Sequence, residues 1–277
     1  MTDHAPEPAA EGEAEGGAAA AAEPAPPLVR YEVQRGFAIL TLDSPHNRNA
    51  LSTRLVAELA RGLAEARVDD AVRGVVLTHT GGVFCAGADL SEASDGDPTA
   101  TPRKLVELMR ALAELPKPVL AKVDGHVRAG GLGLVGACDL AVAGPRATFA
   151  FTEVRLGLAP AVISLPLLPR LDPRGAARWY LTGETFGPAE AARIGLVTEA
   201  AEDVEAAVEP LLDALRKASP QGLAETKKLV AADVLRSIRK DGEDLIAQSA
   251  RLFGSAEARE GMRAFLERRP AAWAQRP

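Results

Sequence analysis

The pattern of apolar and polar positions changes at Leu28, where a polar segment gives way to regular secondary structure. Residues 29–33 and 36–42 alternate between apolar and polar side chains around a short turn, which predicts a β-hairpin. Ser52 then precedes a run in which apolar residues recur at helical spacing. We therefore expect a helix that is capped by Ser52 and extends to about residue 66.

Short apolar runs alternate with a helical period through the first half of this body. We predict buried strands at Gly74–Thr78, Pro118–Val123 and Asp139–Val142, and a helix at Pro102–Leu115. Strands that alternate with helices indicate an α/β fold with parallel pairing.

The C-terminal third carries helical periodicity throughout. Helices are predicted at residues 173–181, 188–194, 204–215, 220–238, 243–253 and 256–268. A helical region that follows an α/β core is often a packing or oligomerisation layer. We predict an α/β core over residues 28–201 and a helical C-terminal region over residues 202–277.

The net charge of −6 belongs to the first 27 residues, which hold six acidic residues and neither Lys nor Arg. Of the 38 acidic residues, 32 remain for the body, the same number as its Lys and Arg residues. A neutral body with 4% aromatic residues argues against binding to nucleic acid or to an anionic membrane. Residues 1–27, rich in Ala, Pro and Glu, are predicted to be a disordered acidic tail, with an acidic interaction segment as the alternative.

Targeting and metal-binding signals are also missing from the sequence. No stretch approaches 18 uninterrupted apolar residues, and no basic segment precedes the Ala-rich run at 18–22. Cys85 and Cys138 are too few for a disulfide framework, and no spacing typical of a metal site occurs. We therefore expect a cytoplasmic protein without a metal ion.

Two glycine-rich segments follow predicted strands. The first is GGVFCAGADL at residues 81–90, and the second is GHVRAGGLG at residues 125–133. Because glycine has no Cβ, the backbone of such turns can approach a ligand closely. Two turns that each direct one N–H at the same oxygen form an oxyanion hole, which suits a thioester carbonyl that becomes an enolate. Taken singly, each segment is also consistent with an ordinary tight turn.

The second segment also contains the pattern GLGLVG at residues 131–136, which matches the GxGxxG fingerprint of dinucleotide-binding proteins. In that fold a full crossover helix follows the glycines before the next strand. The strand predicted at Asp139 begins three residues after Gly136. This distance is too short for a crossover helix and disfavours dinucleotide binding.

Taken together, these motifs resemble the enoyl-CoA hydratase/isomerase (crotonase) superfamily. The resemblance rests, in chain order, on RNAL at 48–51, FCAGADL at 84–90, KPV at 117–119, Gly125, Gly130–Gly131, CD at 138–139, FAFTEVRLG at 149–157 and the helix at 255–268. It covers about residues 28–275, which is everything except the tail.

The resemblance implies a spiral of ββα units followed by helices that build homotrimers or dimers of trimers. It implies an acyl-CoA substrate, with no cofactor besides the CoA of the substrate itself. By position, the N–H groups of Ala88 and Gly130 would hold the thioester oxygen, and Glu153 would be the catalytic acid and base. The substrate would also contact Arg48, through the CoA phosphates, and the two turns at Ala86, Gly87, Ala88, Asp89, Leu90, Gly130, Gly131 and Gly133.

One position departs from the family pattern. Family hydratases typically use two glutamates, and Gly133 stands where the first one is expected, while Glu153 matches the second. Glu153 lies in an apolar stretch, where burial would raise its pKa toward that of a proton shuttle. Three hypotheses stay open: hydration by Glu153 alone, isomerisation of a double bond by proton shuttling, and acyl-CoA binding without catalysis.

Two further features bear on the substrate. The segments GLGLV at 131–135, TEV at 152–154 and LAPAVIS at 158–164 are similar to bacterial hydratases of branched or carboxylated enoyl-CoAs, such as methylglutaconyl-CoA hydratases, and favour hydration. Arg128 could pair with the distal carboxylate of a dicarboxylic acyl group, or could instead face solvent or a structural acid. His126 is expected to be a neutral, hydrogen-bonded histidine, with a place in the pocket wall as the alternative.

Overall fold

The computed structural model describes residues 1–2, 26–89, 92 and 97–275. Almost all of the predicted tail therefore lies outside the described residues, as does Leu90 of the first glycine-rich segment.

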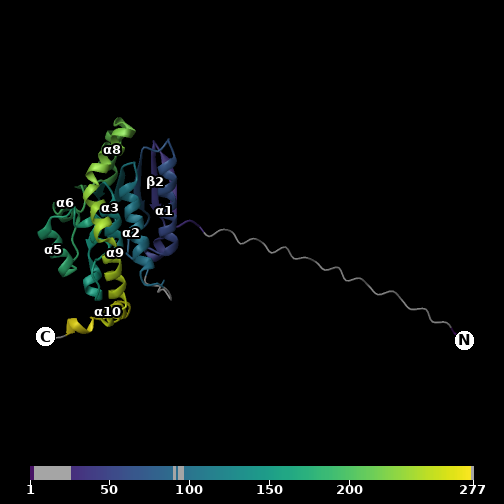
Figure 1. Ribbon diagram of the computed structural model, residues 1–277, viewed down its shortest axis with the longest axis vertical. Helices are drawn as coiled ribbons and strands as arrows, with labels where there is room; N and C mark the ends of the chain where they lie inside the picture. Colours follow the sequence, from purple (N-terminus) through teal and green to yellow (C-terminus); the bar gives the residue numbers. More distant parts are fainter. Residues whose placement is uncertain (3–25, 90–91, 93–96, 276–277) are drawn as a thin grey trace.

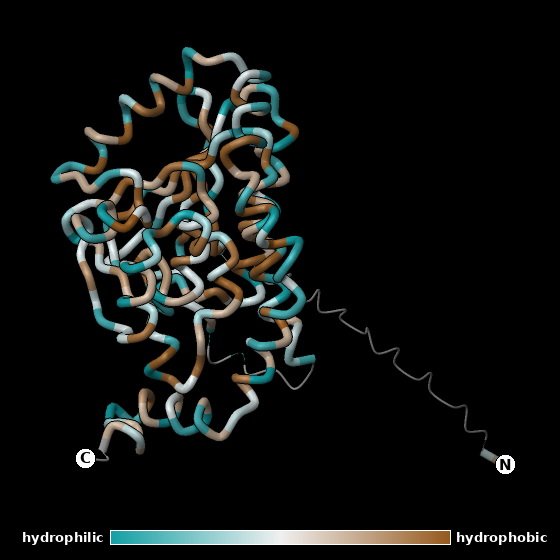
Figure 2. The backbone as a smooth tube through the Cα atoms, turned by 60° about the vertical axis from the view of Figure 1, so that its left-hand side comes forward, coloured by the Kyte–Doolittle hydropathy of each residue, from teal (hydrophilic) through white to brown (hydrophobic). Residues whose placement is uncertain are grey.

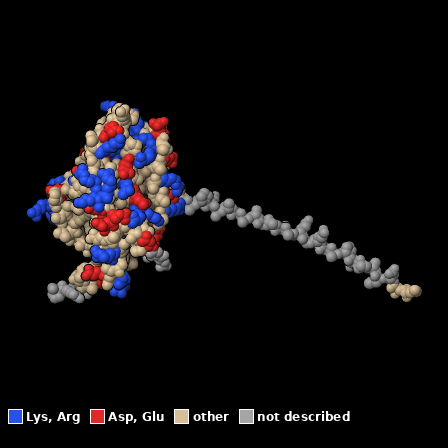
Figure 3. Space-filling view, in the orientation of Figure 1, with Lys and Arg blue, Asp and Glu red and all other residues tan. Residues whose placement is uncertain are grey.

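On the face of the body seen in Figure 3, positive and negative side chains are interspersed. This distribution agrees with a body that is formally neutral.

A six-stranded sheet with the order β1-β2-β3-β5-β7-β9 forms the centre of the fold. Its strands are β1 (Val29–Gln34), β2 (Phe37–Leu42), β3 (Gly74–His79), β5 (Val119–Val123), β7 (Leu140–Ala143) and β9 (Glu199–Ala200). β1 and β2 form an antiparallel hairpin, whereas all other neighbours are parallel. The predicted hairpin and the three predicted buried strands are confirmed, with ends that differ by one residue.

A second, three-stranded parallel sheet was not predicted. It consists of β4 (Val83–Cys85), β6 (His126–Arg128) and β8 (Thr148–Ala150), in that order. Each of these strands follows a strand of the large sheet and precedes a helix, which is α2 (Ala100–Glu114), α3 (Gly130–Ala137) or the 3-10 helix η2 (Thr152–Leu156). The chain therefore repeats a ββα turn three times, and the predicted α/β spiral is confirmed.

The first helix, α1 (Thr53–Val68), is stabilised as its sequence predicts. The Ser52 hydroxyl accepts a hydrogen bond from the Leu55 N–H at 3.2 Å, which satisfies one of the free donors of the first turn. Leu55, Leu59 and Leu63 recur on one face and are buried against the large sheet. Figure 2 shows apolar positions gathered inside the body, where the helices cover the strands.

Helices form most of the second half of the chain (Figure 1). They are α4 (Ser164–Leu167), α5 (Pro173–Thr182), α6 (Pro188–Arg193), α7 (Val204–Lys217), α8 (Pro220–Val230), α9 (Ala232–Phe253) and α10 (Ala256–Leu266); the 3-10 helices η1 (Pro45–Asn47) and η3 (Ala272–Gln275) complete the list of elements. α7 begins two residues after the proposed start of the C-terminal region at residue 202, a division that stays a prediction.

The predicted break between residues 238 and 243 is wrong, because α9 continues through Gly242 and the break falls at Ala231. α9 runs along α2, and a methyl group on Gly242 would lie 4.0 Å from the Val106 side chain of that helix. This is an ordinary van der Waals distance, and the helix continues through the glycine without a break. Across the same contact, the Arg103 guanidinium donates to both carboxylate oxygens of Glu243, at 2.6 and 2.8 Å.

A buried ion pair joins the C-terminal helices to the core. Lys227 of α8 lies 2.7 Å from the Asp139 carboxylate, and the two side chains are 4% and 10% exposed. The Lys227 ammonium also donates to the backbone carbonyls of Leu112 and Lys117, at 2.8 and 3.0 Å. Because a buried charge is costly without partners, this set of contacts fixes α8 on the core.

Candidate active site

The two glycine-rich turns lie against each other where β4 and β6 end. Because these strands are parallel neighbours, the turns that follow them emerge at the same edge of the small sheet. A methyl group on Gly87 would lie 2.8 Å from Ala129 Cβ and 3.6 Å from the Gly130 nitrogen. A methyl group on Gly130 would in turn lie 3.8 Å from Gly87 Cα. At Gly87, where a side chain would collide with Ala129, glycine lets the two backbones approach so closely, whereas a side chain at Gly130 would meet Leu51.

The direction of the Ala88 N–H follows from the neighbouring peptide bond. The Leu51 N–H donates to the Gly87 carbonyl at 2.8 Å, and Leu51 pairs with Ala88 in a parallel bridge. In a trans peptide the carbonyl and the next N–H point in opposite directions. The Ala88 N–H therefore points away from Leu51.

The Gly130 N–H belongs to the first turn of α3. The first N–H groups of a helix have no acceptor within the helix and are available to an oxygen from outside. Ala129 enters the helix with φ 46° and ψ −119°, a conformation that costs energy for a residue with a side chain. The backbone is therefore held in a strained form directly before the proposed donor.

Asn49 fixes the first turn, a role that the RNAL motif at 48–51 did not reveal. Its buried side chain accepts from the Ser44 N–H at 2.7 Å and donates to the carbonyls of Thr80 and Val83, at 3.2 and 2.8 Å. Its φ of 52° is a conformation that Asn tolerates better than most residues. Asn49 thus ties the segment before α1 to the end of β3 and the start of β4.

The predicted contacts to CoA group around the same turn. The Ala86 N–H donates to the Arg48 carbonyl at 3.1 Å, and the Arg48 side chain is exposed beside the turn. Asp89 accepts from the Asn47 side chain at 3.4 Å. Leu90 lies outside the described residues, so its predicted contact has no structural counterpart here.

Glu153 is a buried carboxyl group in η2. It is 9% exposed, and the fully buried rings of Phe149 and Phe151 precede it in the chain. One carboxylate oxygen, Oε2, is buried without a hydrogen-bond partner among the described residues. Burial raises the pKa of Glu153 to about 7, an effect that its own backbone N–H partly opposes. A carboxyl group with this pKa can both accept and donate a proton at neutral pH.

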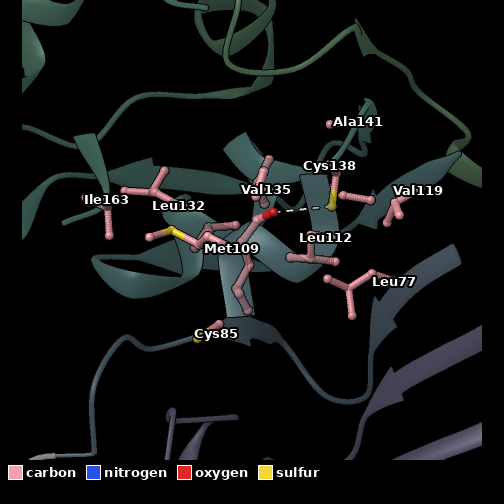
Figure 4. Packing of buried hydrophobic residues seen from close by; sticks show 14 of the residues in the cluster. Leu77, Cys85, Met109, Leu112, Val119, Leu132, Val135, Cys138, Ala141 and Ile163 are labelled. Atoms are coloured by element: carbon pink, nitrogen blue, oxygen red, sulfur yellow. Dashed lines mark hydrogen bonds between the residues drawn. The ribbon is translucent and has the colours of Figure 1, made fainter. Parts of the chain in front are cut away.

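The position of the missing glutamate is filled by apolar side chains. A methyl group on Gly133 would lie 2.8 Å from the Met109 sulfur and 2.9 Å from Ile163 Cγ2. Figure 4 shows Met109 and Ile163 close to each other beside Leu132 of α3. Any side chain at residue 133 would displace Met109 or Ile163, so a second carboxylate does not fit here without repacking.

The comparisons with known proteins agree with this geometry. The model of the enoyl-CoA hydratase/isomerase family matches residues 32–276. This chain belongs to the enoyl-CoA hydratase/isomerase family. The crystal structure of an enoyl-CoA hydratase from Mycobacterium avium is 56% identical, covers 89% of this chain and 98% of its own, and superposes with a TM-score of 0.84.

Two further members of the family differ in the substrates in their names. The mevalonyl-coenzyme A hydratase of Aspergillus fumigatus is 35% identical over 248 residues, which are 85% of this chain and 90% of its own. The crystal structure of carnitinyl-CoA hydratase from Mycobacterium avium is 28% identical, covers 91% of this chain and all of its own, and has a TM-score of 0.80. The family therefore contains hydratases of different acyl-CoA thioesters.

Within this enoyl-CoA hydratase/isomerase fold, the Arg128 side chain is hydrogen-bonded to the neighbouring strand β8. Its guanidinium donates to the Thr148 carbonyl at 2.7 Å and to the Thr148 hydroxyl at 2.9 Å. His126 Nδ1 lies 2.8 Å from the same hydroxyl. Both side chains project from the face of the small sheet opposite the buried Val127. These contacts favour a structural role for Arg128 and a hydrogen-bonded His126.

The GxGxxG pattern is part of α3 itself. The helix runs from Gly130 to Ala137 and is buried along its whole length, and β7 begins at Leu140. The glycines therefore lie inside a short buried helix, where Gly131 packs against Cys85, and not in a turn before a crossover helix. This arrangement excludes the dinucleotide-binding fingerprint.

Residues 26–89, 92 and 97–275 contain no group of three or more His, Cys, Asp or Glu side chains that could hold a metal ion. No helix among them is long and apolar enough to cross a membrane.

Proposed function

We propose that the protein is an enoyl-CoA hydratase that adds water to a 2-enoyl-CoA thioester with a single catalytic glutamate. The observation that carries this proposal is Glu153, a buried carboxyl group with a pKa of about 7, in a fold that brings two donor turns together. The names of the family members described above support hydration.

In the proposed reaction, ionised Glu153 accepts a proton from water while the water oxygen bonds to C3 of the acyl group. The electron pair of the double bond moves toward the thioester, and the negative charge develops on the carbonyl oxygen. The N–H groups of Ala88 and Gly130 stabilise this charge. Protonated Glu153 then gives the proton to C2, which restores the thioester and the ionised carboxylate. One water molecule has been added, and the enzyme is unchanged.

The surroundings of the turns support an uncharged acyl group as substrate. The side chains closest to Gly130 are Leu51 and Leu105, and those closest to Gly133 are Met109 and Ile163. All four are aliphatic or thioether groups. Burying a charged acyl chain against them would cost free energy, because they offer the charge no partner. We therefore propose an aliphatic enoyl group, with a carboxylated one, as in methylglutaconyl-CoA, as the alternative.

Incubation with 2-enoyl-CoA and 3-enoyl-CoA thioesters in water enriched in heavy oxygen tests this function. Hydration predicts a 3-hydroxyacyl-CoA product with the label at C3. Interconversion of the two substrates without uptake of label would establish an isomerase. Tight binding without turnover over a range of chain lengths would leave only an acyl-CoA-binding protein.

The C-terminal helices are proposed to assemble copies of the chain into a homotrimer or a dimer of trimers. Large apolar side chains are exposed at two helix ends: Leu229 and Val230 of α8 are 77% and 62% exposed, and Phe265 and Leu266 of α10 are 56% and 70% exposed. Covering such groups in neighbouring copies would remove apolar surface from water. Sedimentation equilibrium tests the assembly.

A cytoplasmic location is proposed on the grounds that Cys85 and Cys138 are both buried and free, as is usual in a reducing compartment. Fractionation of the source cells tests the location.

A further inference from the structure

The helix α10 packs against the 3-10 helix that carries Glu153. α10 lies beside the end of α9, at one end of the body (Figure 1). Its buried face consists of Ala258, Gly261 and Ala264, three small residues at helical spacing. On this face α10 contacts η2. The contact joins the C-terminal region to the segment that carries Glu153.

Gly261 allows the two backbones to approach each other. A methyl group on Gly261 would lie 2.5 Å from the Leu156 carbonyl carbon and 2.7 Å from Leu156 Cα. Both atoms belong to the backbone of η2, so neither can rotate aside as the end of a long side chain could. A side chain at residue 261 would therefore push α10 and η2 apart.

Gly157, which follows η2, makes the same contact from the other side. A methyl group on Gly157 would lie 2.7 Å from the Glu257 carbonyl carbon and 2.9 Å from the Ala258 nitrogen. Gly157 also has a φ of 72°, in the left-handed region that favours glycine. Two glycines, one on each side, thus bring the backbones of η2 and α10 into contact.

Hydrogen bonds connect this contact to Glu153. The Gly157 N–H donates to the Glu153 carbonyl, and the Leu158 N–H donates to the same oxygen at 3.0 Å. The backbone of Glu153 is therefore tied to the residues that α10 contacts. A shift of η2 would carry the Glu153 carboxyl group with it.

We propose that Gly261 is a positioning residue, through which α10 holds η2 and fixes the place of the Glu153 carboxyl group in the site. This inference rests on the proposed function of Glu153. It gives the C-terminal region a part in the reaction besides its packing on the core. Because a misplacement of about 1 Å can cost roughly 10²-fold in rate, a backbone contact of this kind is enough to affect turnover.

The pKa of Glu153 reports whether η2 is in place. Burial raises this pKa to about 7. If α10 no longer holds η2, water reaches the carboxyl group more easily, and the pKa falls toward its ordinary value of 4.5. A change at Gly261 is therefore expected to appear in the titration of Glu153.

Gly261→Ala in the full-length protein tests the proposal. Infrared difference spectroscopy follows the C=O band of the protonated Glu153 carboxyl, which is the band that Glu153→Gln removes. We expect its titration midpoint to fall by about one unit. In the hydration assay, kcat should fall roughly 10²-fold while KM stays within a factor of a few. A lower pKa leaves more Glu153 in the base form at pH 7, so a loss of ionisation would not explain this fall in kcat.

Gly242→Ala is the matched control, because Gly242 also lies inside a C-terminal helix. A methyl group there would lie 4.0 Å from the Val106 side chain, which is an ordinary contact. Alanine is a better helix former than glycine, so this variant should denature at a temperature roughly 2 °C higher than the wild type. Its Glu153 midpoint and its kcat should equal those of the wild type.

Hydrogen exchange of the wild-type protein supplies a readout that stands even if Gly261→Ala does not fold. In low concentrations of denaturant, the amides of α10 and those of Gly157 and Leu158 should become exposed in one opening event, with the same dependence on denaturant. Exchange of the α10 amides while Gly157 and Leu158 stay protected would overturn the proposal, because η2 would then hold its place without the helix.

A Glu153 midpoint and a kcat equal to those of the wild type in Gly261→Ala would also overturn the positioning role, as would equal changes in Gly261→Ala and Gly242→Ala. A wild-type protein that hydrates no enoyl-CoA would instead refute the proposed function. The infrared midpoint of Gly261→Ala would still decide whether α10 positions Glu153.

Discussion

Gly133 and Met109 pack so closely that a methyl group on the glycine would lie 2.8 Å from the methionine sulfur. The same methyl group would lie 2.9 Å from Cγ2 of the branched Ile163 side chain. Residue 133 therefore lies in a packed core, where Met109 and Ile163 fill the space that a glutamate side chain would need. Among the described residues, Glu153 is the only buried acidic side chain.

Introducing the second glutamate should therefore destabilise the protein. Gly133→Glu brings a longer side chain and a buried charge into the space of Met109 and Ile163, with an expected loss of about 3 kcal/mol or more in the free energy of unfolding. Gly133→Glu combined with Met109→Ala should recover part of that loss, because it makes room. Urea denaturation measures both, and equal stability of the two variants would contradict the packing argument.

The activity of the enzyme should depend on the ionisation of Glu153. Because the base form accepts the proton from water, kcat/KM should rise with pH, reach half of its maximum near the pKa of about 7, and level off above it. A pH profile on a 2-enoyl-CoA measures this. A profile that stays flat from pH 5 to 8 would exclude Glu153 as the base.

Glu153→Gln should stabilise the fold in a manner that depends on pH. Burial raises the folded-state pKa from 4.5 to about 7, so the protonated form is favoured in the folded state. The fold keeps its full stability below about pH 4.5, where the carboxyl group is protonated. Part of this stability is lost as the pH rises through 7 and the buried group ionises. A neutral glutamine escapes that loss.

The gain for Glu153→Gln should therefore be near zero at pH 4.5 and approach roughly 3 kcal/mol at pH 8, an order-of-magnitude figure. Denaturation of both proteins at the two pH values measures it. A gain of the same size at both pH values would show that ionisation of Glu153 does not cost the fold stability.

The Gly130 N–H can be tested without adding a side chain. Replacing Gly130 by glycolic acid through nonsense suppression turns its backbone N–H into an ester oxygen. No side chain is added, so the packing against Leu51 is unchanged. We expect kcat to fall by roughly 10²–10³-fold, the usual effect of one oxyanion donor, with little change in stability. The same replacement at Gly131, the next residue of α3, is the control and should cost far less activity.

Much of the fold could be predicted because its elements carry local signals. The hairpin has an alternating pattern around Arg35–Gly36, and α1 has both a capping serine and a leucine stripe. The small sheet was missed because its strands have three residues each, which is too short for a period. The break predicted between residues 238 and 243 was wrong because α9 is continuous there and lies along α2, which is far away in the sequence.

The candidate site also has parts with local sequence signals and parts without them. Glycine clusters predicted the two turns, and an apolar stretch predicted the burial of Glu153. The role of Asn49 was hidden, since its three hydrogen bonds reach residues on both sides of it in the sequence.

The most direct test of a single-glutamate hydration is the turnover of Glu153→Gln on a 2-enoyl-CoA, measured together with the binding of the CoA thioester. We expect turnover to fall by roughly 10²–10⁴-fold while the dissociation constant stays within a factor of a few, because glutamine keeps the shape of the side chain and loses only proton transfer. Undiminished hydration by this variant would contradict the account.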